Sequence, residues 1–287
     1  MVAKRSKMPK RTVSDFLEMK NRQDVIVRST AYDYPTAVLI DKAGVDMINV
    51  GDSLAVVALG YKSTVPVTID EMIHHCRAVT RGAENAFVVG DMPFMSYNIT
   101  VEKAVENAGR FVKEAGADGV KLEGGKEFAR HVQAITEAGI PVHGHIGFKP
   151  QTSVKVSGIP FQGATAESAK AIIEDAKALE KAGAFAITLE FVVAEIAKII
   201  TKNISVPTIG IGSGPDCDGQ TLPITDILGM YERTPAYAKA YANLHATILQ
   251  AMLHFRREVK NREFPGEEQT FHMTSSEHER LIGLLRR

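Results

Sequence analysis

The sequence predicts an α/β fold, a (β/α)8 TIM barrel with an N-terminal closing helix and a C-terminal helical extension. First, one helix ending recurs: an apolar stretch at helical spacing is closed by Ala-Gly at Gly44, Gly116, Gly139 and Gly183, and glycine can take the left-handed conformation that ends a helix. Second, each ending is followed by a short, continuous apolar run, as expected for parallel strands covered on both faces. Third, nearly every run ends in a polar group, whereas the alternative, an open doubly wound sheet, usually gathers its ligand groups at one switch point.

Seven strands are indicated by these apolar runs, and an eighth is weaker. In order they are Val25–Ala31, Met47–Val50, Phe87–Gly90, Gly119–Leu122, Val142–Gly144, Ala186–Leu189, Thr208–Ile211 and the weak eighth near Leu222–Thr225. An α/β barrel typically needs about 250 residues, so the 287 residues fit a single barrel. We predict one barrel domain with its N-terminal arm and helix over residues 1–262, and a C-terminal tail over residues 263–287.

The helices between the strands follow from start and stop signals. Asp15–Met19 are expected in an N-terminal helix that closes the bottom of the barrel. Thr68 and Glu71 have capping-box spacing for a helix that ends near a looser glycine stop at Gly82. Further helices are expected over Thr100–Glu114, Ala166–Lys181 and, as a long terminal helix, Tyr237–Lys260.

Composition narrows the kind of partner. The hydrophobic fraction of 45% and the charged fraction of 24% are ordinary for a globular protein. The formal net charge is zero, so nothing favours nucleic acid or an anionic membrane, and a small-molecule ligand is expected. No apolar stretch approaches the ~18 residues of a membrane span, and the basic N-terminus lacks the apolar region of a signal peptide. Cys76 and Cys217 lie far apart and are expected to be reduced thiols, which suits a cytoplasmic protein.

Asp52 and Asp91 each follow a glycine at the end of an apolar run. A parallel barrel brings the carboxyl ends of its strands to one face, where two carboxylates would supply the oxygen ligands that Mg²⁺ prefers. Each Asp could instead cap the next helix, but two in the same context favour a metal site. Ser53 could donate a hydrogen bond to a bound carboxylate, or merely start the next helix.

Lys121 and Glu123 lie two residues apart on one expected strand, so both side chains should point to the same face, the barrel interior. A charged pair there must be satisfied, and a site at the barrel mouth would satisfy it. The alternative is a plain ion pair. In a site, Lys121 would neutralise an anionic substrate, and Glu123 would orient Lys121 or a metal-bound water.

Two more polar residues and a glycine-rich turn end strands. His145 could hydrogen-bond a carbonyl or carboxylate oxygen, whereas we interpret His143 as packing. Glu190 ends an apolar run without a cationic neighbour in sequence, which would raise its pKa and suit a general base; a carboxylate at a helix N-terminus is the alternative. The turn Gly210–Gly214 resembles the phosphate-binding turn after strand seven of barrels, or could let another ligand approach the backbone.

These motifs, in this order, make the chain similar to the ketopantoate hydroxymethyltransferase family from about Thr12 to about His272. The segments that carry the resemblance are Thr30–Tyr34, Val50–Ser53, Ser63–Thr68, Gly90–Phe94, Lys121–Gly125, Gly144–Gly147, Pro150-Gln151, Leu189-Glu190, Gly210–Gly214 and Asp218–Gln220.

The resemblance implies transfer of a hydroxymethyl group from 5,10-methylenetetrahydrofolate to 3-methyl-2-oxobutanoate, the first step of pantothenate synthesis, on a barrel of the phosphoenolpyruvate/pyruvate type. The implied Mg²⁺ ligands are Asp52 and Asp91, with Glu123 as a third candidate. The positions that match substrate contacts are Asp52, Ser53, Asp91, Lys121 and His145. Glu190 matches the family's base, and Tyr32 and Phe94 are candidates to contact the 3-methyl branch. A large, decamer-like homo-oligomer is also implied.

The sequence departs from the family pattern in three places. Lys62 stands where an Asp is usual, Phe148-Lys149 replaces a Leu-Thr pair, and Thr221–Ile224 is less apolar than the usual eighth strand. The first two changes lie in loops near the barrel mouth, so they concern the folate site more than the metal site.

Two other functions compete with this one. A folate-independent, Mg²⁺-dependent lyase, mutase or aldolase acting on a 2-oxo acid would use the same enolate chemistry. Its relatives often carry a reactive cysteine on a mouth loop, and neither Cys76 nor Cys217 has that context. A non-catalytic binding protein is disfavoured because the complete set of polar strand-end residues is present.

Overall fold

The computed structural model describes residues 9–155 and 161–287, and its centre is a closed barrel in which each strand pairs with its neighbours in chain order. All eight pairings are parallel, and β8 closes the barrel by pairing with β1. The predicted barrel is therefore confirmed, and the open sheet is excluded. The strands are β1 Ile26–Thr30, β2 Met47–Val50, β3 Phe87–Asp91, β4 Gly119–Glu123, β5 Val142–Gly147, β6 Ala186–Glu190, β7 Thr208–Ile211 and β8 Gly219–Leu222.

Strand ends differ from the prediction in a way that matters for function. β3, β4 and β6 each extend one residue further than predicted, so that Asp91, Glu123 and Glu190 are the last residues of their strands rather than loop residues. β5 extends three residues further and contains His145. Ladder hydrogen bonds therefore fix the backbone of these four residues.

The predicted position of the eighth strand, near Leu222–Thr225, is wrong. β8 begins at Gly219, which pairs with Ile26 of β1 and Ile209 of β7. Its Gly-Gln-Thr-Leu sequence contains only one apolar residue. No apolar run marked the strand, and the two neighbouring strands define it instead.

The N-terminal helix α1, Val13–Arg22, closes the bottom of the barrel as predicted. Its Phe16 ring meets Phe87 edge-on at 5.6 Å and lies 6.0 Å from Phe185. These rings belong to an apolar cluster that also contains Ile26 and Ile209, residues near the amino ends of their strands. The lower half of the barrel is thus a packed apolar core.

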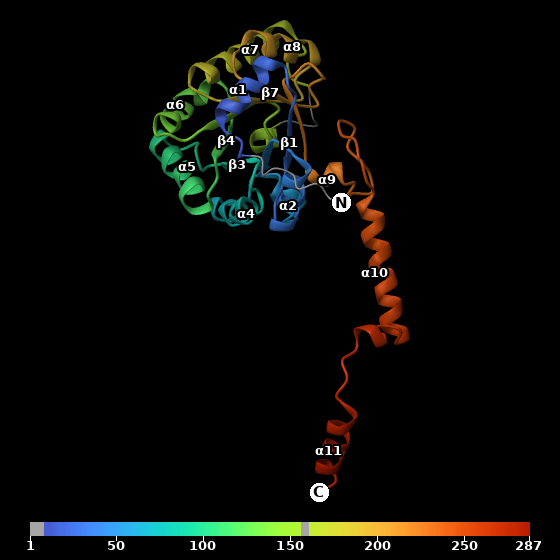
Figure 1. Ribbon diagram of the computed structural model, residues 1–287. Coiled ribbons are helices and arrows are strands. Elements are labelled where there is room, and N and C mark those ends of the chain that lie inside the picture. The colour runs from blue at the N-terminus through green and yellow to red at the C-terminus, as the bar shows by residue number, and fades with distance from the viewer. Residues whose placement is uncertain (1–8, 156–160) are drawn as a thin grey trace.

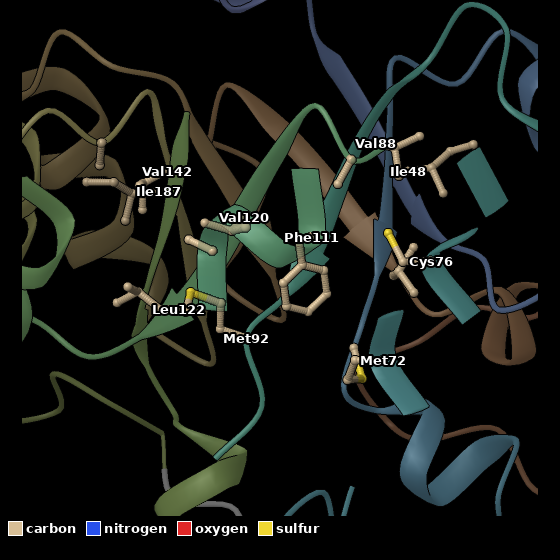
Figure 2. Close-up of a cluster of buried hydrophobic side chains, with 14 of the residues drawn as sticks. Ile48, Met72, Cys76, Val88, Met92, Phe111, Val120, Leu122, Val142 and Ile187 are labelled. Carbon is tan, nitrogen blue, oxygen red and sulfur yellow. The ribbon is translucent and has the colours of Figure 1, made fainter. Parts of the chain in front are cut away.

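A ring of helices surrounds the strands (Figure 1). Its members are α2 Tyr34–Ala43, α4 Ile69–Gly82, α5 Val101–Ala115, α6 Ala129–Glu137, α7 Ala166–Lys181 and α8 Ala194–Asn203. Thr68 forms the predicted capping box with Glu71 at the start of α4. Apolar side chains from the strands and helices fill the space between the two layers, among them Met72, Val88 and Phe111 in Figure 2.

Four of the five glycines predicted to end helices have the left-handed backbone conformation expected there. Gly44, Gly116, Gly139 and Gly183 all have positive φ angles. Gly82 is different, because it is the last residue of α4 and has no positive φ. A Cβ atom at Gly82 would lie 2.8 Å from the carbonyl oxygen of Tyr34 and 2.9 Å from the Cβ of Ala37. The helix ends at Gly82 as predicted, and the absence of a side chain there also allows α2 and α4 to approach closely.

The C-terminal segment leaves the barrel and extends away from it (Figure 1). After the short α9, Ile224–Ile227, helix α10 runs from Leu244 to Asn261, so its predicted start at Tyr237 is wrong by seven residues. Asn243 caps α10 by accepting the amide of Ala246 at 3.2 Å. The predicted tail, residues 263–287, contains the 3-10 turn η3, Glu267–Gln269, and α11, Ser275–Leu285. Within the described ranges, no helix is long and apolar enough to cross a bilayer.

Candidate active site

A cavity of about 150 Å³ opens at the carboxyl ends of the barrel strands. All seven residues that the sequence suggested for metal, substrate and base line it: Asp52, Ser53, Asp91, Lys121, Glu123, His145 and Glu190. The structure therefore brings together residues from five successive strand ends, β2 to β6, as predicted. The lining also contains Arg28, Thr30, Asn49, Thr64, Pro150, Thr188, Ile211, Thr221, Pro223 and Tyr237.

Asp52 and Asp91 face each other across the ends of β2 and β3, and both are buried. The backbone amide of Asp52 donates to Asp91 Oδ2 at 3.1 Å, and Lys121 Nζ lies 3.0 Å from the same oxygen. Asp91 Oδ1 is buried without a hydrogen-bond partner in the described residues. Burial, reinforced by the nearby Asp91, raises the pKa of Asp52 to about 7. Two buried carboxylates so close together resist being ionised at the same time, and a further positive charge beside them would favour the ionised form of both.

Lys121 and Glu123 point into the cavity from β4, as strand alternation predicted. Burial by itself would lower the pKa of Lys121, but the nearby Asp91, Glu123 and Asp52 outweigh it and raise that pKa. Lys121 is therefore a cation at neutral pH. Burial, with the charge of Asp52 next in importance, raises the pKa of Glu123 well above its ordinary value.

His145 and Glu190 form the opposite wall. His145 Nε2 lies 3.1 Å from Glu190 Oε2, although the contact is not aligned as a hydrogen bond. Lys121 Nζ lies 3.4 Å from His145 Nδ1. Burial, and then the Lys121 charge, lowers the pKa of His145 well below its ordinary value, so the imidazole is neutral. Since an ammonium group can only donate, Nδ1 is the acceptor and Nε2 carries the proton.

Glu190 has the environment expected of a general base. Burial raises its pKa to about 7, while Lys121 and Arg28 act in the opposite direction. A carboxylate with this pKa is largely ionised just above neutral pH and binds a proton more strongly than an exposed Glu does.

A polar layer beneath the cavity was not predicted. Arg28 reaches from β1 across the barrel, where its Nη1 donates to Thr188 Oγ1 of β6 at 2.9 Å and lies 3.1 Å from His143 Nε2 of β5. His143 is thus a hydrogen-bonding member of this layer and not packing alone. The signal in the sequence was an arginine inside an otherwise strand-like run. Burial lowers the pKa of Arg28 only to about 10, so it remains a cation.

The carboxylates fit a divalent cation that also binds water and substrate. Among the described residues, no group of three or more His, Cys, Asp or Glu side chains is arranged to hold a metal by itself. Mg²⁺ commonly takes only one or two protein carboxylates and keeps water or substrate oxygens at its other positions. Asp52 and Asp91, with the unpartnered Oδ1 of Asp91, match that pattern.

Neither of the two residues predicted to contact the methyl branch of a substrate, Tyr32 and Phe94, lines the cavity. Tyr32 is buried behind Ser53, with the two hydroxyls 2.9 Å apart. Phe94 lines a different hollow, next to Lys103 and Arg110 of α5. The apolar part of the cavity wall instead comes from Pro150, Ile211, Pro223 and Tyr237. Tyr237 was missed because its segment has a helical pattern in sequence but forms a loop.

The glycine-rich turn after β7 contacts the end of β6 and the loop that follows it. Ser213 Oγ donates to the carbonyl of Leu189 at 2.8 Å and accepts the amide of Val192 at 3.0 Å. A side chain at Gly212 would collide with the Phe191 ring. The turn therefore braces the loop that follows Glu190, which gives it a positioning role.

Two of the three departures from the family pattern lie outside the cavity wall, and the third, Thr221–Ile224, contributes to it. Lys62 is exposed. The Phe148 ring packs against Phe191 with centroids 5.7 Å apart, and Lys149 pairs with Glu127 at 3.0 Å. Neither of these two departures lines the cavity, whereas Thr221 and Pro223 of the third departure do.

Comparison with known proteins agrees with this geometry. Residues 10–267 match the family model of ketopantoate hydroxymethyltransferase. The chain is 52% identical over 274 residues to the 3-methyl-2-oxobutanoate hydroxymethyltransferase of Syntrophobacter fumaroxidans (strain DSM 10017 / MPOB), covering 95% of this chain and 97% of that one. It is 52% identical over 267 residues to the enzyme of the same name from Syntrophus aciditrophicus (strain SB), covering 93% and 98%.

Solved structures share the fold at much lower identity. The crystal structure of 2,3-dimethylmalate lyase, a PEP mutase/isocitrate lyase superfamily member, superposes with a TM-score of 0.56 over 96% of this chain and 95% of that chain, at 14% identity. At this identity the likeness concerns the barrel alone.

Proposed function

The chain belongs to the ketopantoate hydroxymethyltransferase family, and we propose that it transfers a hydroxymethyl group from 5,10-methylenetetrahydrofolate to 3-methyl-2-oxobutanoate in a Mg²⁺-dependent reaction. The product is ketopantoate, and the step is the first of pantothenate synthesis. The observation that carries the mechanism is the division of the cavity, with the paired carboxylates of Asp52 and Asp91 beside Lys121 on one side and Glu190 beside His145 on the other.

Asp52 and Asp91 would hold Mg²⁺, with Glu123 beside them. When bound, the cation would supply Lewis acidity toward the keto oxygen of the 2-oxo acid, which acidifies the C3 proton. Lys121 adds a fixed positive charge 3.0 Å from Asp91. Ser53 offers a hydroxyl to the substrate carboxylate from the rim of the same wall.

Glu190 removes the C3 proton in this proposal. It is half ionised at its pKa of about 7 and more fully ionised above it. Because it is the last residue of β6, the barrel fixes the position of its backbone. The neutral His145 directs its Nε2–H toward the same region, 3.1 Å from Glu190 Oε2. That proton can be donated to an oxygen on which negative charge develops, while Lys121 holds the other ring nitrogen.

Carbon C3 then attacks the methylene carbon of the folate donor, both C–N bonds of that methylene break, and water supplies the hydroxyl oxygen. Tetrahydrofolate leaves with its two nitrogens protonated, by the proton removed from C3 and a proton from the water. The cavity is narrow and mostly walled by buried residues, which limits competing protonation of the enolate by solvent. The donor must therefore approach from the open mouth, past the loops after β5 and β8.

Neither cysteine is placed for a cysteine-dependent reaction. Cys76 lies buried in α4 and Cys217 lies buried before β8, outside the cavity lining. Burial raises the pKa of the Cys76 thiol to about 12 and that of Cys217 to about 11. Both thiols are therefore protonated at neutral pH, which disfavours the folate-independent lyase with a reactive mouth cysteine.

Proton NMR in D₂O tests both halves of the reaction. Purified protein with 3-methyl-2-oxobutanoate should lose the C3 proton signal only when Mg²⁺ is present. Adding 5,10-methylenetetrahydrofolate should then produce ketopantoate. Exchange without product would point to the folate-independent rival, and no exchange by folded protein would refute the proposed enolate step.

A Glu190→Gln variant is the matched control for the base. It should keep Mg²⁺-dependent binding of the 2-oxo acid, since the amide preserves the shape of the side chain. C3 exchange should fall by at least about 100-fold, the lower range for general-base catalysis. Exchange at the wild-type rate would remove Glu190 from the mechanism.

Assembly and location complete the proposal. A large homo-oligomer is supported by the exposed apolar side chains of α10, among them Met252 and Phe255. A cytoplasmic location is supported by the two free cysteines.

A further inference from the structure

Gln151 connects the candidate cation pocket to the loop after β5. It is buried in the 3-10 turn η2, Pro150–Lys155. Its Nε2 donates to Asp52 Oδ2 at 2.9 Å and to the carbonyl oxygen of Met92 at 3.0 Å. Its backbone amide donates to Glu123 Oε2 at 3.2 Å, and its Oε1 accepts the Tyr97 hydroxyl at 2.7 Å. One residue thus contacts the ends of β2, β3 and β4.

Three of the four carboxylates that line the cavity, those of Asp52, Asp91 and Glu123, share one arrangement, in which the protein hydrogen-bonds one oxygen and leaves the other without a hydrogen bond to a described residue. For Asp52, Gln151 holds Oδ2, and Oδ1 has no hydrogen bond to a described residue. For Asp91, the Asp52 amide and Lys121 hold Oδ2, and Oδ1 has no partner in the described chain. For Glu123, Gln151 holds Oε2, whereas Oε1 has no hydrogen bond to a described residue and lies 3.6 Å from His145 Nδ1. Gln151 therefore fixes two of the three groups.

The amide of Gln151 has a defined orientation. The Met92 carbonyl can only accept a hydrogen bond, so the amide atom that contacts both it and Asp52 Oδ2 must be the NH₂ group. The other side of the amide then accepts from Tyr97, whose ring packs edge-on against Phe128 at 5.1 Å. Both ends of the Gln151 amide therefore form hydrogen bonds in fixed donor and acceptor roles. A residue that only filled space would not require such bonds.

We propose that Gln151 is a positioning residue for the divalent cation, acting through Asp52 and Glu123. The inference rests on the proposed Mg²⁺ dependence. A carboxylate that is free to rotate loses side-chain entropy when it binds a cation, whereas one already held presents its second oxygen at no such cost. Gln151 also makes cation binding depend on the placement of the loop after β5, because the same residue belongs to that loop.

A Gln151→Met variant tests the proposal. Methionine has a similar length but no donor, so Asp52 loses its partner while the backbone contact to Glu123 remains. Isothermal titration of Mg²⁺ into protein saturated with 3-methyl-2-oxobutanoate should give a dissociation constant at least about tenfold above wild type. At saturating Mg²⁺, KM for 3-methyl-2-oxobutanoate should change by less than about twofold.

Two further variants separate positioning from packing. Tyr97→Phe removes the hydroxyl that anchors Gln151, and it should weaken Mg²⁺ binding in the same direction but less. Gln133→Met makes the same substitution on the exposed face of α6, where the amide contacts only Glu137. It should leave Mg²⁺ binding unchanged. Circular dichroism on heating verifies that each variant is folded, and Tyr97→Phe decides the matter if Gln151→Met does not fold.

The outcomes separate this inference from the proposed function. Wild-type protein that binds Mg²⁺, together with folded variants whose dissociation constants stay within about twofold of it, would overturn the inference alone. A KM for the 2-oxo acid that remains raised at saturating Mg²⁺ would also overturn it, because Gln151 would then shape the substrate pocket. Wild-type protein that binds no Mg²⁺ would overturn the proposed metal dependence and this inference with it.

Discussion

Burial makes Glu190 a base suited to neutral pH. The end of β6 carries the side chain to the cavity wall, where loss of solvent raises its pKa to about 7 against the opposing charges of Lys121 and Arg28. An exposed glutamate, with a pKa near about 4.3, would be ionised more fully but would bind a proton much less strongly. The same residue type therefore has a different chemistry because of its place in the barrel.

C3 proton exchange should slow as the pH falls below neutrality. Glu190 must be deprotonated to accept the proton, and its protonated fraction grows below its pKa of about 7. The exchange rate should drop about tenfold per pH unit on the acid side. NMR exchange rates in D₂O buffers from about pH 5.5 to about pH 8.5 measure this. A flat profile over that range would contradict the assignment of the base.

Arg28 should control the pH below which C3 exchange slows, that is, the position of the acid limb of the pH–rate profile. It is a buried cation that forms no ion pair with a described residue, and its charge lowers the pKa of Glu190. Arg28→Met removes the charge, so the pKa of Glu190 should rise and the limb should move to higher pH. Arg28→Lys keeps the charge and should leave the limb near its wild-type position. If both variants have the wild-type profile, the polar layer has no electrostatic role in catalysis.

Elements with a strong local signal were predicted well from the sequence. The capping box of Thr68 and Glu71 and the glycine stop at Gly116 depend on a few neighbouring residues. β8 gave no such signal, because the pairing of Gly219 with strands on both sides defines it. The start of α10 was misplaced because the residues from Tyr237 onward have helical composition, yet the chain uses them as a loop at the mouth.

The site was predictable where a polar residue ended an apolar run. Asp52, Asp91, Glu123, His145 and Glu190 were found in this way. Side chains that reach the site from the middle of a strand or from a loop gave no such pattern. Arg28 crosses the barrel to contact β5 and β6, and Gln151 reaches back over three strand ends. Contacts of this kind join residues far apart in the chain, so a local pattern cannot reveal them.

A pair of glycine substitutions should separate helix packing from helix propensity. At Gly82, a Cβ would press against the Tyr34 carbonyl and the Ala37 side chain of α2, so Gly82→Ala should destabilise the protein by about 1–3 kcal/mol. Gly109, in the interior of α5, has open space around it. Gly109→Ala should stabilise by up to about 1 kcal/mol, since alanine favours the helix. Thermal melting measures both, and a stabilised Gly82→Ala variant would contradict the close approach of α2 and α4.

The whole barrel divides into two ends with different chemistry. The lower end is closed by α1 and filled with apolar rings such as Phe16, Phe87 and Phe185. The upper end gathers the carboxylates and cations of the cavity. Packing at one end supplies rigidity, and that rigidity keeps buried charges of the other end in place despite the cost of removing them from water.

Helix α10 has a row of apolar side chains that are exposed in the single chain. α10 spans 18 residues without one buried side chain. Ile248, Met252, Phe255 and Val259 are all exposed, and their spacing of four, three and four residues places them along one side of the helix. A helix with an uncovered apolar stripe gains little from packing. The proposed homo-oligomer would cover this stripe and so stabilise the helix.

Charge placed on that stripe should therefore weaken assembly. Met252→Lys puts an ammonium group in the middle of the stripe, and its burial in a subunit contact would be costly. Gln250→Lys adds the same charge to the same helix, about 160° away around its axis, and should have no effect. Sedimentation equilibrium at matched concentrations should give a lower mass for Met252→Lys than for wild type and for Gln250→Lys. Because α10 projects away from the barrel (Figure 1), circular dichroism should detect an unchanged barrel in both variants. Equal masses for all three proteins would mean that the stripe is not a subunit contact.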